Sequence, residues 1–197
     1  MQNIVGNSYD KFGSKNPLSR WLMDRFLETI VRLAQSTAPK RVLEVGCGEG
    51  KLVAHLHSRL PSVQEFAACD LSLEKLDPAI PSDIAFKVGS AYALPYADNS
   101  FDLVVCAEVL EHLECPERAL AELCRTSSRY LLVSTPREPL WRLLNLCRLA
   151  YVKQLGNTPG HIQHFSPESL ERLLTSRCNL LKQARPIPWV VMLTECA

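Results

Sequence analysis

Three glycines at alternate positions, with one acidic residue just before them and another some distance after, are the clearest indication of a ligand-binding turn in this chain. The glycines are Gly46, Gly48 and Gly50. Glu44 lies near the end of the apolar run before them, and Asp70 comes twenty residues after the last glycine. Glycine lets the backbone approach a ligand closely, and a carboxylate can accept hydrogen bonds from both hydroxyls of a ribose. The pattern predicts a nucleoside-binding turn between a strand and a helix.

The glycine spacing separates this turn from two other nucleotide-binding turns. A dinucleotide-binding turn has the pattern G-x-G-x-x-G and points a helix N-terminus at a pyrophosphate, whereas this chain has E-x-G-x-G-x-G. A P-loop is excluded because no Gly-Lys-Ser/Thr sequence follows at the required spacing. Because Glu44 would repel a phosphate and attract an ammonium group, we expect a ligand that carries an amino group. A glycine turn without any ligand is the alternative.

The glycine turn and two later segments are similar to a known enzyme family. The turn resembles motif I of the class I S-adenosylmethionine-dependent methyltransferases. Residues 94–102 (L-P-x-x-x-x-S-F-D) and 108–113 (E-V-L-E-H-L) resemble the type 11 subgroup, which acts largely on small molecules and lipids. The resemblance covers roughly residues 40–135 and is looser elsewhere. It implies S-adenosyl-L-methionine as the cofactor, which carries an amino-acid end, a sulfonium and an adenosine but no phosphate.

The resemblance also implies roles for the residues around this turn. Glu44 would orient the turn or meet the ammonium group of the cofactor, directly or through water. Asp70 would bind the ribose hydroxyls, and Leu71 would lie against the adenine. Ser90 replaces an aspartate that often accepts the adenine amino group in this family, and a hydroxyl accepts more weakly than a carboxylate. The cofactor-binding residues expected on this basis are Glu44, Gly46, Cys47, Gly48, Asp70, Leu71, Ser90, Ala91 and Glu108.

Histidines supply the candidate catalytic groups. Methyl transfer needs a nucleophile in line with the sulfonium, and a general base helps where that nucleophile carries a proton. His112 is the first candidate, because it follows the fourth strand and imidazole titrates near neutral pH. Glu111 would orient His112 or lie in solvent. His161 and His164 could face the same site from a later loop, and a packing role is the alternative for all three histidines.

Two other functions stay open. Glu108, Glu111 and His112, joined by His161 or His164, resemble the divalent-metal set of small-RNA 2′-O-methyltransferases and of some ubiquinone-pathway O-methyltransferases. Oxygen and nitrogen ligands suit Mg²⁺, Mn²⁺ or Zn²⁺, although E-x-x-E-H is common in type 11 chains with no metal implied. The remaining hypothesis is a regulatory subunit that binds the cofactor without transferring a methyl group.

Composition limits the class of protein. The chain has 197 residues, 47% of them apolar, and a formal net charge of +1. This length suits one domain with a full core, and the near-neutral charge argues against a nucleic-acid groove. The sequence has neither a membrane-spanning apolar stretch nor a signal-peptide pattern at its start, so we expect a cytoplasmic protein. Its eight cysteines contain no C-x-x-C pair, which favours reduced, buried thiols.

The elements that position these residues alternate along the chain. Helices are expected at 17–34 and 51–60, from 116, at 140–155 and from 167, with a short helical turn at 72–76. Alternation of strands and helices predicts a parallel sheet with helices on both faces. The last two strands are too close for a helix between them, so they should pair antiparallel. The expected strands are 41–45, 63–71, 84–88, 102–107, 130–134, 179–185 and 189–194.

The expected fold is therefore α/β, a Rossmann-like doubly wound sheet of five parallel strands plus an antiparallel terminal pair. The resemblance implies the strand order 3-2-1-4-5-7-6. Residues 1–197 would form a single domain. Its parts would be an N-terminal helical cap (1–38), a cofactor-binding core (40–135), a substrate lid (135–165) and a C-terminal helix with the strand pair (166–197).

The lid is the segment expected to select the acceptor. Its helix has a broad apolar surface interrupted by Arg142, Arg148 and Lys153. This pattern favours a cover over a small-molecule or lipid-like acceptor, with peripheral membrane contact where the acceptor is membrane-borne. A helix packed on the sheet, with its basic residues in water, is the alternative. We expect methyl transfer to oxygen or nitrogen of the acceptor.

Overall fold

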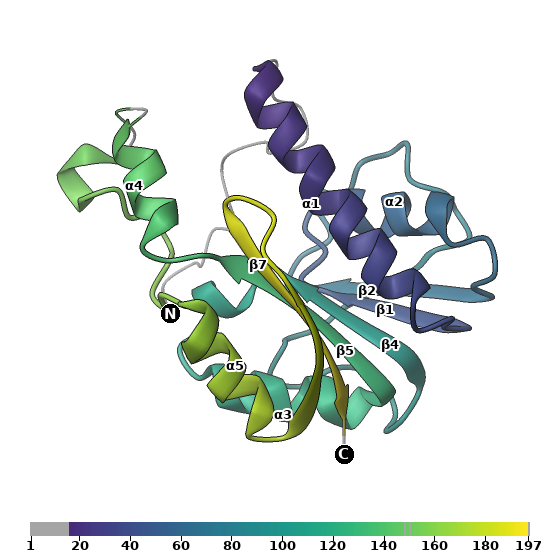
Figure 1. Ribbon diagram of the computed structural model, residues 1–197. Coiled ribbons are helices and arrows are strands. Elements are labelled where there is room, and N and C mark those ends of the chain that lie inside the picture. The colour runs from purple at the N-terminus through teal and green to yellow at the C-terminus, as the bar shows by residue number, and fades with distance from the viewer. Residues whose placement is uncertain (1–15, 148, 150, 197) are drawn as a thin grey trace.

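A seven-stranded sheet in the order β3-β2-β1-β4-β5-β7-β6 organises the chain (Figure 1). The computed structural model describes residues 16–147, 149 and 151–196. Strands β1 to β5 run parallel, and β7 pairs antiparallel with both β5 and β6. The strands are β1 (Arg41–Val45), β2 (Glu65–Asp70), β3 (Ala85–Val88), β4 (Phe101–Ala107), β5 (Ser127–Pro136), β6 (Cys178–Ala184) and β7 (Trp189–Cys196).

Helices cover both faces of the sheet, as its alternating apolar side chains require. In β1, Val42 packs into a core that includes residues of α1 and α2, whereas Leu43 packs into a second core with α3 and α5. Figure 1 shows α4 projecting away from the sheet. In the described part of the chain, no helix is long and apolar enough to cross a membrane. The helices are α1 (Pro17–Gln35), α2 (Lys51–Arg59), η1 (Leu110–His112), α3 (Pro116–Thr126), α4 (Leu140–Cys147), η2 (Val152–Gln154) and α5 (Pro167–Thr175).

The expected sheet is confirmed in strand order, strand direction and the antiparallel terminal pair. The short helical turn expected at 72–76 is present as one hydrogen-bonded turn and does not extend into a helix. Leu76 donates to the carbonyl of Leu73 in a single turn, and prolines at 78 and 81 oppose a longer helix. Of the expected N-terminal cap, residues 1–15 lie outside the described residues, as does Arg148 of the lid.

The single helix expected over 140–155 is wrong. Helix α4 ends at Cys147, and the chain then turns back along it. Arg142 Nε donates to the carbonyl of Leu155 at 3.1 Å, and Asn145 Nδ2 donates to the carbonyl of Gly156 at 2.8 Å. These hydrogen bonds hold a returning chain that has left-handed backbone at residues 149, 151 and 155, which a continuous helix cannot have.

Asp102 joins the start of β4 to the start of β1. Its Oδ2 accepts hydrogen bonds from the backbone N–H groups of Lys40 and Arg41, at 2.8 and 2.9 Å. Its Oδ1 accepts from the Arg41 guanidinium at 3.1 Å. Partial burial by itself raises the pKa of Asp102, but these hydrogen bonds outweigh it and the pKa is lowered. The ionised carboxylate therefore fixes the amino-terminal edge of the sheet.

Substituting Asp102→Ala should destabilise the fold by about 1–3 kcal/mol, because two backbone N–H groups lose their acceptor. The folded-state pKa is lowered, so the contribution of Asp102 is present above the ordinary pKa of about 3.9 and is lost as the pH falls through the folded-state value. Urea unfolding at several pH values measures both effects. Asp24→Ala, on the exposed side of α1, is the control and should change stability by less than about 0.5 kcal/mol. Equal stability of the two variants would contradict this role.

Candidate cofactor and acceptor site

The carboxyl ends of β1, β2 and β4 lie at one edge of the sheet. The register places Val45 beside Cys69 of β2 and Cys106 of β4. The backbone N–H groups of Gly46 and Cys47 both donate to the carbonyl of Cys69, at 2.8 and 3.2 Å. The glycine turn is thus fixed to the end of β2, and it follows β1, where the strand order reverses between β1 and β4. Open α/β sheets bind their ligands at such a point.

Two glycines of the turn have left-handed backbone for different reasons. The φ angles of Gly46 and Gly48 are +78° and +52°. A Cβ atom on Gly46 would collide with Cγ2 of Val109, so this glycine is needed for packing. A Cβ atom on Gly48 would meet no atom of the described residues within 4 Å. Cys47 between them is buried, and burial raises the pKa of its thiol, which favours the neutral thiol over a reactive thiolate.

Asp70 lies at the mouth of this open space. Its Oδ2 accepts a hydrogen bond from the backbone N–H of Gly48 at 2.8 Å. Leu71 follows it and is 61% exposed, which leaves an apolar surface next to the carboxylate. The arrangement places an anion and an apolar side chain side by side, as a ribose and its base would require.

Ser90 and Ala91 follow β3 and lie at the same edge as Asp70. The intervening residue, Gly89, donates from its backbone N–H to the carbonyl of Asp70 at 2.9 Å. The Ser90 hydroxyl oxygen accepts a hydrogen bond from the backbone N–H of Tyr92 at 3.2 Å. This contact fixes the side chain of Ser90 in a turn while its O–H remains a donor.

Glu44 is buried beneath the glycine turn. Desolvation raises the pKa of Glu44 to about 8, opposed by a hydrogen bond from the backbone N–H of Val53, with a small further increase from Asp70. Val53 belongs to the first turn of α2, whose N-cap residue supplies no side-chain cap. Among the described residues, none hydrogen-bonds Oε2 of Glu44. These contacts favour the orienting role over attraction of an ammonium group, which needs the ionised form.

Glu108 directly follows β4 in an uncommon conformation. Its φ of +61° is left-handed, which is rare for a residue with a side chain and is concentrated at functional sites. Its Oε2 accepts from Trp189 Nε1 at 2.8 Å, and its Oε1 accepts from the Ser134 hydroxyl at 3.3 Å. The carboxylate is therefore held toward β5 and β7, at the carboxyl end of β4.

Glu111, His112 and His161 come together although the two histidines are far apart in sequence. One possible ligand atom from each lies within 4.8 Å of the others, and the histidine rings meet edge to face at 4.9 Å. His112 Nδ1 lies 2.9 Å from the carbonyl of Gly160. Because a carbonyl can only accept, Nδ1 donates, which makes Nε2 the nitrogen that can accept a proton.

His164 lies outside this cluster. It is exposed, and its Nε2 hydrogen-bonds with Oδ1 of Asn157 at 2.9 Å. Glu108 is also held elsewhere, against Trp189. Of the acids and histidines suggested by the sequence, the structure thus brings three into one group and leaves Glu108 and His164 apart from it.

A row of aromatic rings that sequence analysis missed leads from the core to this cluster. Phe26 and Trp189 have centroids 4.6 Å apart, and Trp189 and Trp141 are 5.9 Å apart. Trp141 then stacks on His161 at 6.2 Å, and its Nε1 donates to the Thr158 hydroxyl at 2.9 Å. These rings come from α1, β7, α4 and a loop, so no local pattern marks them. Neighbouring rings are tilted by 25–52°, and Phe26, Trp189 and His161 are buried, so the row is a packed aromatic contact between these elements.

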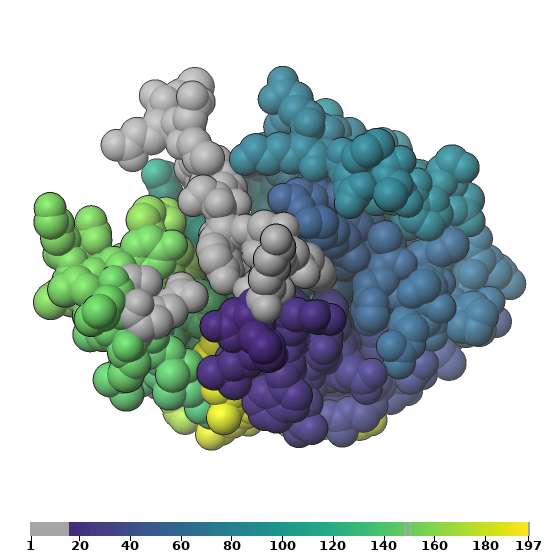
Figure 2. All heavy atoms as spheres, turned by 90° about the horizontal axis from the view of Figure 1, so that it is seen from above, coloured from purple at the N-terminus to yellow at the C-terminus, as the bar shows by residue number. Residues whose placement is uncertain are grey.

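The lid exposes apolar side chains beyond these rings. In Figure 2 the green lid segment lies on one side of the face, and the blue-to-teal loops after β2 and β3 lie on the other. The basic residues Arg142 and Lys153 belong to the same segment. Five apolar side chains of the lid are more than half exposed, namely Leu143, Leu149, Val152, Leu155 and Ile162.

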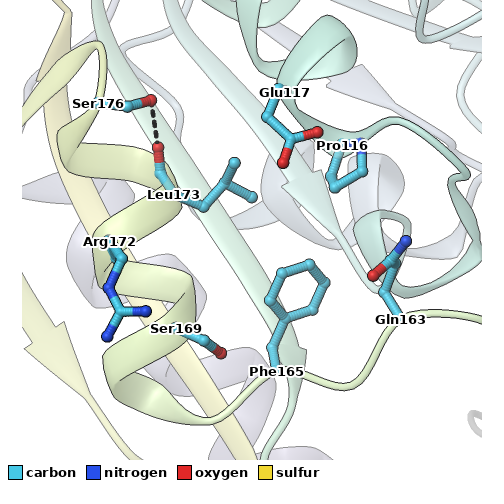
Figure 3. Close-up of a pocket in the computed structure, with 8 residues that line it drawn as sticks. All are labelled: Pro116, Glu117, Gln163, Phe165, Ser169, Arg172, Leu173 and Ser176. Carbon is cyan, nitrogen blue, oxygen red and sulfur yellow. Dashed lines mark hydrogen bonds between the residues drawn. The ribbon is translucent and has the colours of Figure 1, made fainter.

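A separate hollow of about 310 Å³ lies between α3 and α5 (Figure 3). Phe165 and Leu173 project into it, with Glu117 and Arg172 at its sides. None of the expected cofactor-binding or catalytic residues lines this hollow. It is therefore not part of the site at the carboxyl ends of the strands.

Comparison with known proteins decides the family. A protein-family model described as a methyltransferase domain matches residues 43–129. Demethylmenaquinone methyltransferase of Porphyromonas gingivalis is 31% identical over 134 residues, which are 64% of this chain and 54% of that protein. Residues 43–129 therefore form a class I S-adenosylmethionine-dependent methyltransferase domain. The mitochondrial ubiquinone biosynthesis O-methyltransferase of Schizosaccharomyces pombe is 29% identical over 147 residues, 69% of this chain and 53% of that protein.

Solved structures of this methyltransferase family share the fold. The N-methyltransferase NodS from Bradyrhizobium japonicum, in complex with S-adenosyl-L-homocysteine, superimposes with a TM-score of 0.69 at 18% identity. The match covers 98% of this chain and 94% of NodS. The chain spans only about half the length of the two curated relatives above.

The buried acid of this methyltransferase domain gives a pH-dependent prediction. The pKa of Glu44 is raised from 4.5 to about 8, so the folded protein retains a proton that the unfolded chain releases between these values. Stability should therefore fall as the pH rises from 4.5 to about 8. Glu44→Gln still offers an acceptor to Val53 but cannot ionise, and we expect it to flatten this decline in urea unfolding. Glu49→Gln, in which a 44% exposed side chain is changed, should keep the wild-type slope. An unchanged slope in Glu44→Gln would show that Glu44 ionises normally.

Proposed function

We propose that this chain is an S-adenosylmethionine-dependent methyltransferase that acts on oxygen or nitrogen of a small-molecule or lipid-like acceptor. The observation that carries the proposal is the open space at Gly48 with the Asp70 carboxylate at its mouth. Buried Glu44, which accepts a hydrogen bond from the backbone N–H of Val53, supports the turn from beneath. Membership of the family supports S-adenosylmethionine as the ligand that fits these features.

Each part of the cofactor has a matching group in this chain. The backbone at 46–48 would hold the amino-acid end, and Asp70 would accept hydrogen bonds from the ribose hydroxyls. Leu71 would cover the adenine, with Ser90 and Ala91 at its edge. When bound, the cofactor supplies a methyl group on an activated leaving group, so the main task of the protein is to hold the two reactants in line.

The aromatic rings and the lid support the part of the proposal that concerns the methyl acceptor. Trp141 and His161 stack and would accommodate a planar body. The names of two relatives, for demethylmenaquinone and for ubiquinone biosynthesis, support an aromatic, quinone-like acceptor. The exposed apolar residues of the lid, with Arg142 and Lys153, support peripheral contact with a membrane that holds such an acceptor.

His112 would serve as the general base. Its Nδ1 donates to Gly160, which fixes the ring and makes Nε2 the basic nitrogen. Where the acceptor is a hydroxyl or an amine, Nε2 would take its proton during transfer. Glu111 directly precedes His112 in the chain. It is buried, so it would position His112 rather than touch the acceptor.

Metal-assisted O-methylation is the second candidate. The grouping of Glu111, His112 and His161 favours it, because one carboxylate and two imidazoles suit Zn²⁺ or Mn²⁺. A bound divalent cation would polarise an acceptor oxygen. A regulatory subunit that binds the cofactor without catalysis is the third, and it would retain donor binding while showing no transfer.

Donor-binding variants test the cofactor half. Asp70→Ala removes an ionised acceptor and should weaken S-adenosylhomocysteine binding by about 10- to 150-fold, the equivalent of 1.5–3 kcal/mol. Gly48→Val places a side chain in the open space and should abolish binding. Calorimetric titration measures both, with circular dichroism to confirm folding. Asp83→Ala, which removes a surface partner of His57, should bind normally. Unchanged affinity in Asp70→Ala would remove this residue from the ribose site.

The histidine variant tests the catalytic half. His112→Ala should lower turnover by about 10²- to 10⁴-fold while leaving donor affinity intact, because the base acts only on the acceptor. The assay uses labelled donor with a pooled small-molecule extract. His57→Ala, at the surface pair with Asp83, is the matched control.

The outcomes of this assay separate the three candidates. Activity that survives a chelator supports the general base, whereas activity that is lost and then restored by Zn²⁺ or Mn²⁺ supports the metal. Wild-type turnover in His112→Ala would leave this histidine a structural role. Donor binding without transfer to any component of the extract would favour the regulatory subunit.

A further inference from the structure

Three cysteines that are far apart in sequence meet at the edge of the sheet opposite the glycine turn. Cys124 comes from α3, Cys178 begins β6 and Cys196 ends β7. Cys178 and Cys196 are directly paired across the two strands. The Sγ atoms of Cys124 and Cys178 are 3.3 Å apart, those of Cys178 and Cys196 are 3.7 Å apart, and all three lie within 4.8 Å of one another.

These separations match those of thiolates that share a metal ion. With a Zn–S bond of about 2.3 Å, tetrahedral geometry puts neighbouring sulfur atoms about 3.8 Å apart. Two of the sulfur separations, 3.3 and 3.7 Å, are near this value and the third is no more than 4.8 Å, so little rearrangement of the backbone is needed. Soft thiolate ligands select Zn²⁺ and Cu⁺ over oxygen-seeking cations.

The surroundings give the cluster access to solvent and a neighbouring cation. Cys178 is buried, whereas Cys124 and Cys196 are half-buried, which leaves an entry path. Arg177 directly precedes Cys178 in the chain. Arg177 itself is exposed and can offset the negative charge of a thiolate cluster.

We propose that Cys124, Cys178 and Cys196 form a binding site for one thiophilic cation, with Zn²⁺ as the expected ion. Binding replaces thiol protons, which pass to solvent, and requires no oxidant. The ion would join α3 to the β6–β7 pair and would stabilise the folded chain by binding it in preference to the unfolded one. The site is remote from the glycine turn and does not depend on the proposed methyl transfer.

Cobalt substitution tests the site in the full-length protein. The chain is reduced, stripped with a chelator and titrated with Co²⁺, whose thiolate charge-transfer absorption reports sulfur ligands. We expect this band to saturate at one ion per chain and to be displaced by Zn²⁺. The Glu111, His112 and His161 group contains no sulfur and cannot produce the band.

Serine variants assign the ligands. Cys178→Ser should remove the band. Cys124→Ser and Cys196→Ser should each weaken Zn²⁺ binding by at least about tenfold, because even the loss of a residue that only hydrogen-bonds a metal ligand lowers the affinity by that much. Cys115→Ser, at an exposed cysteine outside the cluster, should bind as wild type.

Two results would overturn the proposal, and one would change only the ion. The proposal fails if the folded, reduced wild type shows no thiolate band and takes up neither Zn²⁺ nor Cu⁺, whether or not two of the cysteines form a disulfide on oxidation. It also fails if binding survives in all three serine variants. Uptake of Cu⁺ alone, dependent on these three cysteines, would support the site and identify the ion as Cu⁺. The wild-type measurement stands even if Cys178→Ser does not fold.

Discussion

The hydrogen bonds that tie the glycine turn to the end of β2 are the constraint on which the site depends. Two successive N–H groups, of Gly46 and Cys47, share the carbonyl of Cys69, and the N–H of Gly48 is held by the Asp70 side chain. This geometry requires left-handed backbone at both glycines, and the space beside Gly46 is already filled by Val109. Without these contacts the backbone at Gly48 and the Asp70 carboxylate would not lie next to each other.

At the same edge of the sheet, Trp189 contacts both the residue that follows β4 and the lid. Its indole N–H donates to Glu108 at the end of β4, and its ring contacts both Phe26 of the core and Trp141 of the lid. Trp189 therefore links the residue that follows β4 to the core and to α4. The lid itself is fixed by Asn145, which donates to the carbonyl of Gly156 in the returning chain.

Sequence alone could predict the parts of the structure that depend on local patterns. The apolar runs, the glycines and Asp70 lie in short segments whose spacing indicates strands and a turn, and the structure has those strands in the expected order. The sequence predicts a lid helix that is longer than the observed one, because its apolar spacing continues past Cys147. In the structure, hydrogen bonds from the side chains of Arg142 and Asn145 hold the returning chain instead. A three-dimensional contact of this kind leaves no periodic signal.

The groupings that sequence could not predict all join distant segments. Trp141 meets Trp189, and His112 meets His161, through contacts between segments that are far apart in the chain. The cysteine cluster likewise joins α3 to the C-terminal strands. The sequence contains no C-x-x-C pair that could have indicated it. Short-range spacing is informative for a turn that binds a ligand with its backbone, and uninformative for sites assembled from side chains across the fold.

A crystal structure of the wild-type chain with S-adenosylhomocysteine tests the central claim most directly. We expect both ribose hydroxyls within hydrogen-bonding distance of the Asp70 carboxylate, the amino-acid tail along the backbone at 46–48, and the sulfur facing the side of the site that holds His112. A nucleoside bound elsewhere on the chain, or a structure from saturating ligand in which Asp70 contacts no ligand atom, would contradict it.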